Sequence, residues 1–140
     1  MMRPVGLALA LFLTACRDDP DALRGDVQIV AAHEGEMMQA AARRLARHGR
    51  AALPPIEAAL HTADEAGRKN LLYALRQTGE AEAIPLLRHL ALHDAAEGVR
   101  HEALWTLEQW ATGPGNDERT RRARAAVREI QEQQGREETG

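Results

Sequence analysis

The sequence has a single cysteine and few aromatic residues. Aromatic residues make up 3% of the 140 residues, and Cys16 has no second cysteine with which to form an internal disulfide. Beyond the N-terminal segment, the aromatic residues are Tyr73, Trp105 and Trp110. Three scattered rings argue against a platform on which nucleic-acid bases stack. The fold must therefore be stabilised by the packing of aliphatic side chains.

The sequence also lacks an excess of positive charge. Its 18 Lys and Arg residues stand against 21 Asp and Glu residues, which gives a formal net charge of −3. Binding to nucleic acid without sequence preference depends on cationic groups that neutralise phosphates, so this balance provides no general attraction to nucleic acid. Hydrophobic residues make up 44% and charged residues 28% of the chain, which is typical of one small globular domain.

The longest apolar segment is too short to stay in a membrane as a helix. Residues 5–15 carry no charge and follow the cationic Arg3, which is the layout of a secretory signal. A spanning helix needs about 20 apolar residues. Residues 13–16 read Leu-Thr-Ala-Cys, and this segment resembles the lipobox of bacterial lipoproteins.

The lipobox resemblance implies a signal peptide over residues 1–15 and a covalent lipid on Cys16, which would begin the mature protein. Two or three acyl chains anchor a protein stably, whereas one chain holds it marginally. Arg17 follows the cysteine where an Asp tends to retain lipoproteins at the inner membrane, so we expect the periplasmic side of the outer membrane. The alternative is an ordinary signal peptide that is cleaved elsewhere, for example after residues 8–10.

The mature chain is predicted to consist of a tether, a domain and a tail. Residues 16–35 are expected to form the lipidated N-terminus and tether, because residues 17–26 are polar and contain Pro20 and Gly25. Within this segment, residues 27–32 could form a strand or the opening turns of the first helix, and we favour the helix. We assign residues 36–134 to the domain and residues 135–140 to a polar tail.

An internal repeat organises the domain. Ala41, Leu45 and Gly49 recur thirty residues later as Leu71, Leu75 and Gly79, residues 52–56 recur as 83–87, and a third copy starts at Val99. Each unit is predicted to contain two helices. The first helix has apolar positions four residues apart and is ended by the glycine. The second helix carries proline in its first turn, where no intrahelical partner for an N–H is lost.

This pattern resembles the HEAT-like repeat family. The resemblance implies an all-α fold, a short right-handed α–α superhelix of about three helix pairs. Arg44 stands at a position that is usually small, Thr106 replaces an alanine of the third unit, and residues 112–117 form a longer turn than the pattern has. The alternative is a helical bundle without repeats. The matching residues are Arg68, Leu71, Ala74, Leu75, Gly79, Ala83, Ile84, Pro85, Leu87, Leu90, Val99, Arg100, Ala103 and Leu107.

Histidines are the residues that could carry chemistry. His89 and His93 are four residues apart on one helix face, and Glu97 or His101 could complete a zinc-like set. Such spacing often arises by chance, so we predict no metal and no cofactor other than the lipid. His101 and Glu102 form one pair that resembles the His-Glu motifs of deoxyhypusine hydroxylase, a di-iron enzyme of the HEAT-like family. The preceding unit has Lys69 and Asn70 at this place, so the set of ligands is incomplete.

We therefore predict a monomeric, non-enzymatic module that binds a protein partner in the cell envelope. HEAT-like solenoids usually present the surface of their second helices to the partner. The alternatives are a small metal-dependent or lyase-type enzyme and a passive envelope component. Trp105 and Tyr73 are expected to serve packing, whereas Trp110 is expected to be partly exposed. The candidate partner-binding residues are Glu57, His61, Arg88, His89 and His93.

Overall fold

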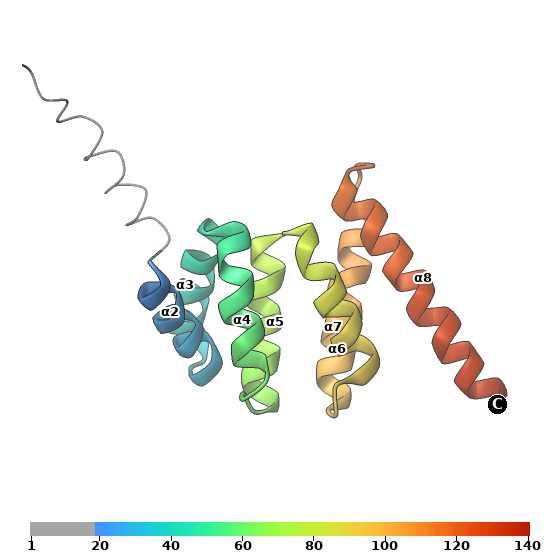
Figure 1. Ribbon diagram of the computed structural model, residues 1–140, viewed down its shortest axis with the longest axis horizontal. Helices are drawn as coiled ribbons and strands as arrows, with labels where there is room; N and C mark the ends of the chain where they lie inside the picture. Colours follow the sequence, from blue (N-terminus) through green and yellow to red (C-terminus); the bar gives the residue numbers. More distant parts are fainter. Residues whose placement is uncertain (1–18) are drawn as a thin grey trace, which may run out of the picture.

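The computed structural model describes residues 19–140, which form α-helices and two short 3-10 helices without a strand (Figure 1). The prediction of an all-α fold is confirmed. Residues 1–15 and Cys16 lie outside the described residues. Within residues 19–140, no helix is both long enough and apolar enough to cross a bilayer. The helices are α2 (Pro20–Ala32), α3 (Gly35–Arg47), α4 (Leu53–Leu60), α5 (Glu65–Thr78), α6 (Ile84–His93), α7 (Glu97–Ala111) and α8 (Glu118–Thr139).

The helices follow one another along the long axis of the molecule, from α2 at one end to α8 at the other (Figure 1). The predicted units correspond to the pairs α3/α4, α5/α6 and α7/α8, and the first helices α3, α5 and α7 pack against each other in that order. Gly49 and Gly79 have φ angles of 54° and 63°, the left-handed conformation that lets the chain turn after a first helix. Pro54 and Pro85 lie in the first turns of α4 and α6, as predicted.

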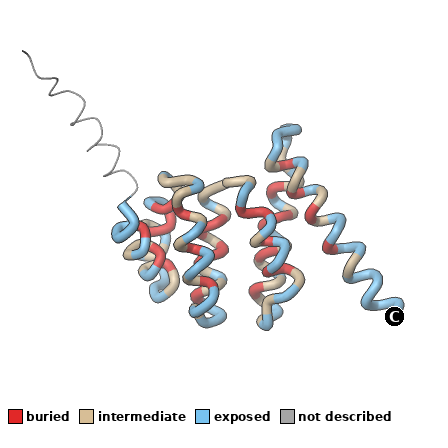
Figure 2. Tube along the Cα trace, in the orientation of Figure 1, coloured by how far each residue is buried: buried red, intermediate tan, exposed pale blue. Residues whose placement is uncertain are grey.

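The core lies between the helices of neighbouring units. Leu45, Leu75 and Leu107, which are equivalent in the three units, are fully buried. Buried and exposed stretches alternate along the helices, as expected for helices that each present one apolar face (Figure 2). Because no unit can cover its own apolar face, each depends on the next unit for burial.

The structure corrects the predicted tether. Residues 20–32 form helix α2, and its Leu23, Val27 and Val30 are buried in the core. Contrary to the prediction, Pro20 does not interrupt a helix but begins one. A proline in the first turn costs no hydrogen bond, and Asp19 caps the helix by accepting from the backbone N–H of Asp21. Residues 27–32 are helical, as favoured, but they end α2 and do not open the first helix of the repeat, which is α3.

Helix α2 also explains why a large residue can occupy the position of Arg44. The Arg44 guanidinium donates from Nε and from an η nitrogen to Asp26 Oδ1 on α2, at 3.0 and 2.7 Å. The hydrogen bond that Arg44 donates to this carboxylate raises the pKa of Arg44 above its ordinary value. A small residue at this position would leave Asp26 without this partner.

The polar tail predicted for residues 135–140 is also corrected, because α8 continues to Thr139. Asp117 caps the start of this helix, and its carboxylate accepts from the backbone N–H of Thr120 at 2.8 Å. This backbone hydrogen bond lowers the pKa of Asp117 below its ordinary value. Ala123 and Ile130 lie on the buried face of α8, so α8 closes the stack with its polar face outward.

Replacing each of two helical glycines with alanine is expected to change the stability of the protein in opposite directions. A Cβ at Gly67, in α5, would lie 2.8 Å from the backbone oxygen of Ala31, whereas a Cβ at Gly25, in α2, meets nothing within 4 Å. Gly25→Ala should therefore raise the free energy of unfolding by about 0.5–1 kcal/mol, the usual gain in a helix. Gly67→Ala should lower it, because overpacking costs about 1–3 kcal/mol and exceeds that gain. Urea unfolding of both variants measures whether the free energy of unfolding rises or falls in each. A stabilised Gly67→Ala variant would contradict the close approach of α2 to α5.

Candidate functional site

Four of the five predicted partner-binding residues line one hollow between α4 and α6. Glu57 lies on α4, His61 directly follows that helix, and His89 and His93 lie on α6. The hollow has a volume of about 610 Å³. All four side chains are exposed, so they form a polar rim that a partner can reach.

The floor of this hollow is apolar. Leu60 and Leu90 contribute side chains that are 7% exposed, and the half-buried Leu86 of α6 lines the same hollow. These residues project from α4 and α6 toward the same space because they share the helical spacing of the core stripes. A partner that places an apolar side chain here removes it from water while its polar neighbours contact the rim.

Arg88, the fifth predicted residue, does not line this hollow, although it lines a neighbouring one together with His89 and His93. It lines a smaller hollow between α6 and α8, and its guanidinium forms an ion pair of 2.5 Å with Glu129 of α8. Because Arg88 is one residue before His89, the helical turn places it about 100° away from the histidine face. Sequence spacing indicated its exposure correctly but could not reveal the carboxylate of α8.

The structure brings only part of the zinc-like set together. The rings of His89 and His93 have centroids 5.1 Å apart. Glu97 and His101 line a different hollow, formed with Lys69 and with the C-terminal part of α8. Across residues 19–140, no group of three or more His, Cys, Asp or Glu side chains is arranged to hold a metal ion.

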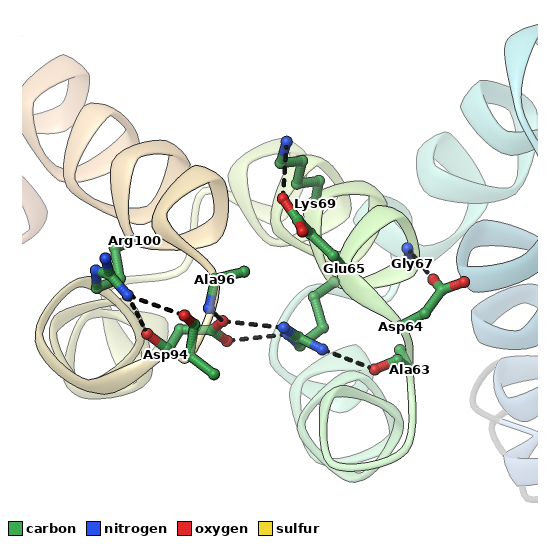
Figure 3. Close-up of polar contacts among 10 residues, drawn as sticks. Ala63, Asp64, Glu65, Gly67, Lys69, Asp94, Ala96 and Arg100 are labelled. Atoms are coloured by element: carbon green, nitrogen blue, oxygen red, sulfur yellow. Dashed lines mark hydrogen bonds and ion pairs between the residues drawn. The ribbon is translucent and has the colours of Figure 1, made fainter.

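A polar network at the end of the hollow links successive units. Asp94, in the turn after α6, accepts from Nε and Nη2 of Arg68, each at 3.0 Å, and from the backbone N–H of Ala96 at 2.9 Å. Arg68 also donates to the carbonyl of Ala63, and Arg100 donates to the carbonyl of Asp94. Figure 3 shows the turn with Asp94, Ala96 and Arg100 beside the start of α5.

This network determines how α5 meets the α6–α7 turn. The Asp94 side chain is 6% exposed and that of Arg68 is 19% exposed, so both charges depend on each other for compensation. Both residues line the hollow between α4 and α6. Arg68 belongs to the repeat pattern of the sequence, but its partner Asp94 could not be predicted because the two residues are 26 positions apart.

The environment of Trp110 is opposite to the one expected, whereas Trp105 packs against an arginine at the surface. Trp110 is 6% exposed, and Arg119 of α8 lies over its ring, so the prediction that it is partly exposed is wrong. Trp105 is 39% exposed. Its ring stacks on Arg76, whose Cζ lies 4.6 Å from the Trp105 centroid and 5.2 Å from that of Tyr73. Helix α8 covers Trp110, and periodicity within α7 could not show this.

Comparison with known proteins identifies one family. The family model described as HEAT repeats matches residues 27–108, which is more than half of the chain. The match starts within α2 and ends within α7, so it includes both walls of the hollow between α4 and α6. No curated protein and no solved structure matches the chain.

Proposed function

Because the chain belongs to the family of HEAT repeats, we propose that it is a non-enzymatic protein-binding module held in the bacterial cell envelope by a lipid on Cys16. Repeats of this family are commonly protein-interaction modules. The observation that carries the proposal is the hollow between α4 and α6, in which an apolar floor is surrounded by Glu57, His61, His89 and His93. This combination of a desolvated centre and a polar rim is the general anatomy of a protein interface.

The charges inside the hollow support binding rather than catalysis. Arg68 and Asp94 are already bonded to one another and to backbone groups, so neither is available as a mobile acid or base. Their role is to hold the walls of the hollow. Binding energy then comes from the apolar floor, with the histidines and Glu57 setting which partner fits.

The proposed lipid would hold this module close to the membrane. Helix α2 begins at Pro20, so residues 17–19 separate it from Cys16 and span at most about 10 Å. The partner would thus be a protein at or near the same membrane. We propose the periplasmic side of the outer membrane, on the basis of Arg17 next to the cysteine, and a monomeric protein.

Site-specific crosslinking in intact envelopes tests the binding surface. A photoreactive residue at His89 should yield one predominant adduct, whereas the same residue at Gln77, exposed on the first helix α5, should not. The double change His61→Ala, His93→Ala should reduce the His89 adduct at least severalfold and leave the thermal midpoint nearly unchanged, because both side chains are exposed. Equal adducts from both positions would contradict the assigned surface.

Elemental analysis tests the enzyme alternative. It would be favoured by one bound transition metal per chain that is lost in the double variant His89→Ala, His93→Ala.

The anchor has its own test. Mass spectrometry of the membrane fraction should detect an acylated N-terminal peptide that starts at Cys16, and Cys16→Ser should abolish both the acyl mass and membrane retention. A signal-cleaved product without acyl mass would contradict lipidation. It would leave the binding surface unaffected, because the described fold begins after this cysteine.

A further inference from the structure

A second surface lies at the corner between the end of α7 and the first half of α8. Arg121, Arg124 and Arg128 are exposed there, and they line a hollow of about 480 Å³ together with Ala111 and Val127. Their spacing of three and four positions places the three arginines on one face of α8. None of these residues lines the hollow between α4 and α6.

Within residues 19–140 the three guanidinium groups form no ion pair, although Asp117 at the start of α8 is near enough to Arg121 for an electrostatic interaction. Arg124 donates from Nε to the carbonyl of Ala111 at 2.9 Å, and Arg121 donates to the carbonyl of Asn116. Over residues 19–140, no carboxylate lies within ion-pair distance of Arg121, Arg124 or Arg128. The arginines that do pair with carboxylates are Arg24, Arg44, Arg50, Arg68, Arg76, Arg88 and Arg122.

The geometry leaves N–H donors available around an apolar centre. A guanidinium has five N–H groups, and backbone carbonyls occupy only one from Arg121 and one from Arg124. Ala111 and Val127 are half-buried between these charges, and the aliphatic parts of the arginines extend this apolar surface. An occupant that fits must combine carboxylates with an apolar group.

We propose that this corner binds an acidic segment of a partner protein, with its carboxylates on the three arginines and one apolar side chain in the hollow. Arg121 and Arg128 are seven positions apart on α8, a rise of about 10 Å. Carboxylates two and four positions apart on an extended segment point to the same side and are separated by about 7 and about 13 Å, which brackets this distance. Arginine pairs with carboxylates through two parallel N–H···O bonds, which favours this chemistry.

A membrane surface fits this corner less well. A helix that lies in a bilayer interface inserts a face of large apolar side chains. On α8 the large apolar residue Ile130 is fully buried, and the exposed large hydrophobic residues among those described are Met37 on α3 and Trp105 on α7. The hollow shape also suits an inserted side chain more than a flat layer of headgroups.

Fluorescence anisotropy with a labelled peptide tests the proposal on the purified full chain in nonionic detergent. The probe is Ser-Glu-Glu-Leu-Ser-Glu-Glu-Ser, and its controls replace each Glu with Gln or the Leu with Ser. The triple change Arg121→Gln, Arg124→Gln, Arg128→Gln should weaken binding of the acidic probe at least about tenfold, since hydrogen bonds between charged groups are lost. The Gln probe should not bind, and the Ser probe should bind more weakly than the Leu probe.

The matched control is Arg43→Gln, Arg47→Gln, Arg136→Gln, which removes the same charge from other exposed arginines. It should change binding by less than about twofold. If the thermal midpoint of the α8 triple variant falls well below that of the parent protein, the single variant Arg128→Gln replaces it. This variant should still weaken binding of the acidic probe measurably. Equal loss in both triple variants, or no loss in the α8 variants, would overturn the proposal. A third outcome would also overturn it. If the protein bound phosphatidylglycerol nanodiscs through the α8 arginines but did not bind the peptide, the ligand would be a membrane surface.

Discussion

Replacement of Asp94 by alanine is expected to lower the free energy of unfolding by about 3 kcal/mol. The change removes the acceptor of two hydrogen bonds from Arg68 and of one from the backbone N–H of Ala96. Removing one partner of a buried pair costs about 3–5 kcal/mol, because the remaining charge is desolvated without compensation. The low end applies here, since the Arg68 side chain retains 19% exposure and its bond to Ala63. Chemical denaturation of the purified variant measures the loss.

Asp21→Ala is the matched control, because Asp21 also pairs with an arginine, Arg24, but both side chains are largely exposed. Exposed ion pairs contribute about 0–1 kcal/mol, so this variant should stay close to the parent protein. A similar loss in the two variants would show that the Arg68–Asp94 pair behaves as a surface pair. A loss confined to Asp94→Ala should be accompanied by a weaker adduct at His89, because the pair lines the same hollow.

Leu75→Ala is expected to lower the free energy of unfolding by about 2–5 kcal/mol. Leu75 is fully buried at the centre of the stack, and the change leaves a cavity that the surrounding helices fill only in part. This is a large share of the roughly 5–15 kcal/mol that stabilises a typical domain. Thermal and urea unfolding should both detect it.

Glu132→Ala on the exposed face of α8 provides the control for the leucine stripe. It should change the free energy of unfolding by no more than about 0.5 kcal/mol, as other surface substitutions do. Leu45→Ala and Leu107→Ala should behave like Leu75→Ala, because the three leucines are equivalent and all fully buried. If Leu75→Ala matched the Glu132→Ala control, the repeat register would be wrong.

Particular residues show how far sequence reasoning reached. The glycines at 49 and 79 and the prolines at 54 and 85 reported the helix ends correctly, because their backbone preferences act locally. The same rule failed at Pro20, since a proline marks the start of a helix as readily as its interruption. The exposed candidates Glu57, His61, His89 and His93 were found from periodicity, and the structure shows that they line one hollow.

The sequence by itself determined the all-α class, the repeat register and the core leucines of the repeats, because these follow from helical period and from backbone preferences within a few residues. Only the tertiary structure decided which distant groups meet. It paired Arg68 with Asp94 and Arg88 with Glu129, placed Arg119 over Trp110, and left Arg121, Arg124 and Arg128 without an ion pair among the described residues. Such contacts depend on how successive helix pairs stack, and interactions between residues tens of positions apart leave no periodic signal in a single sequence.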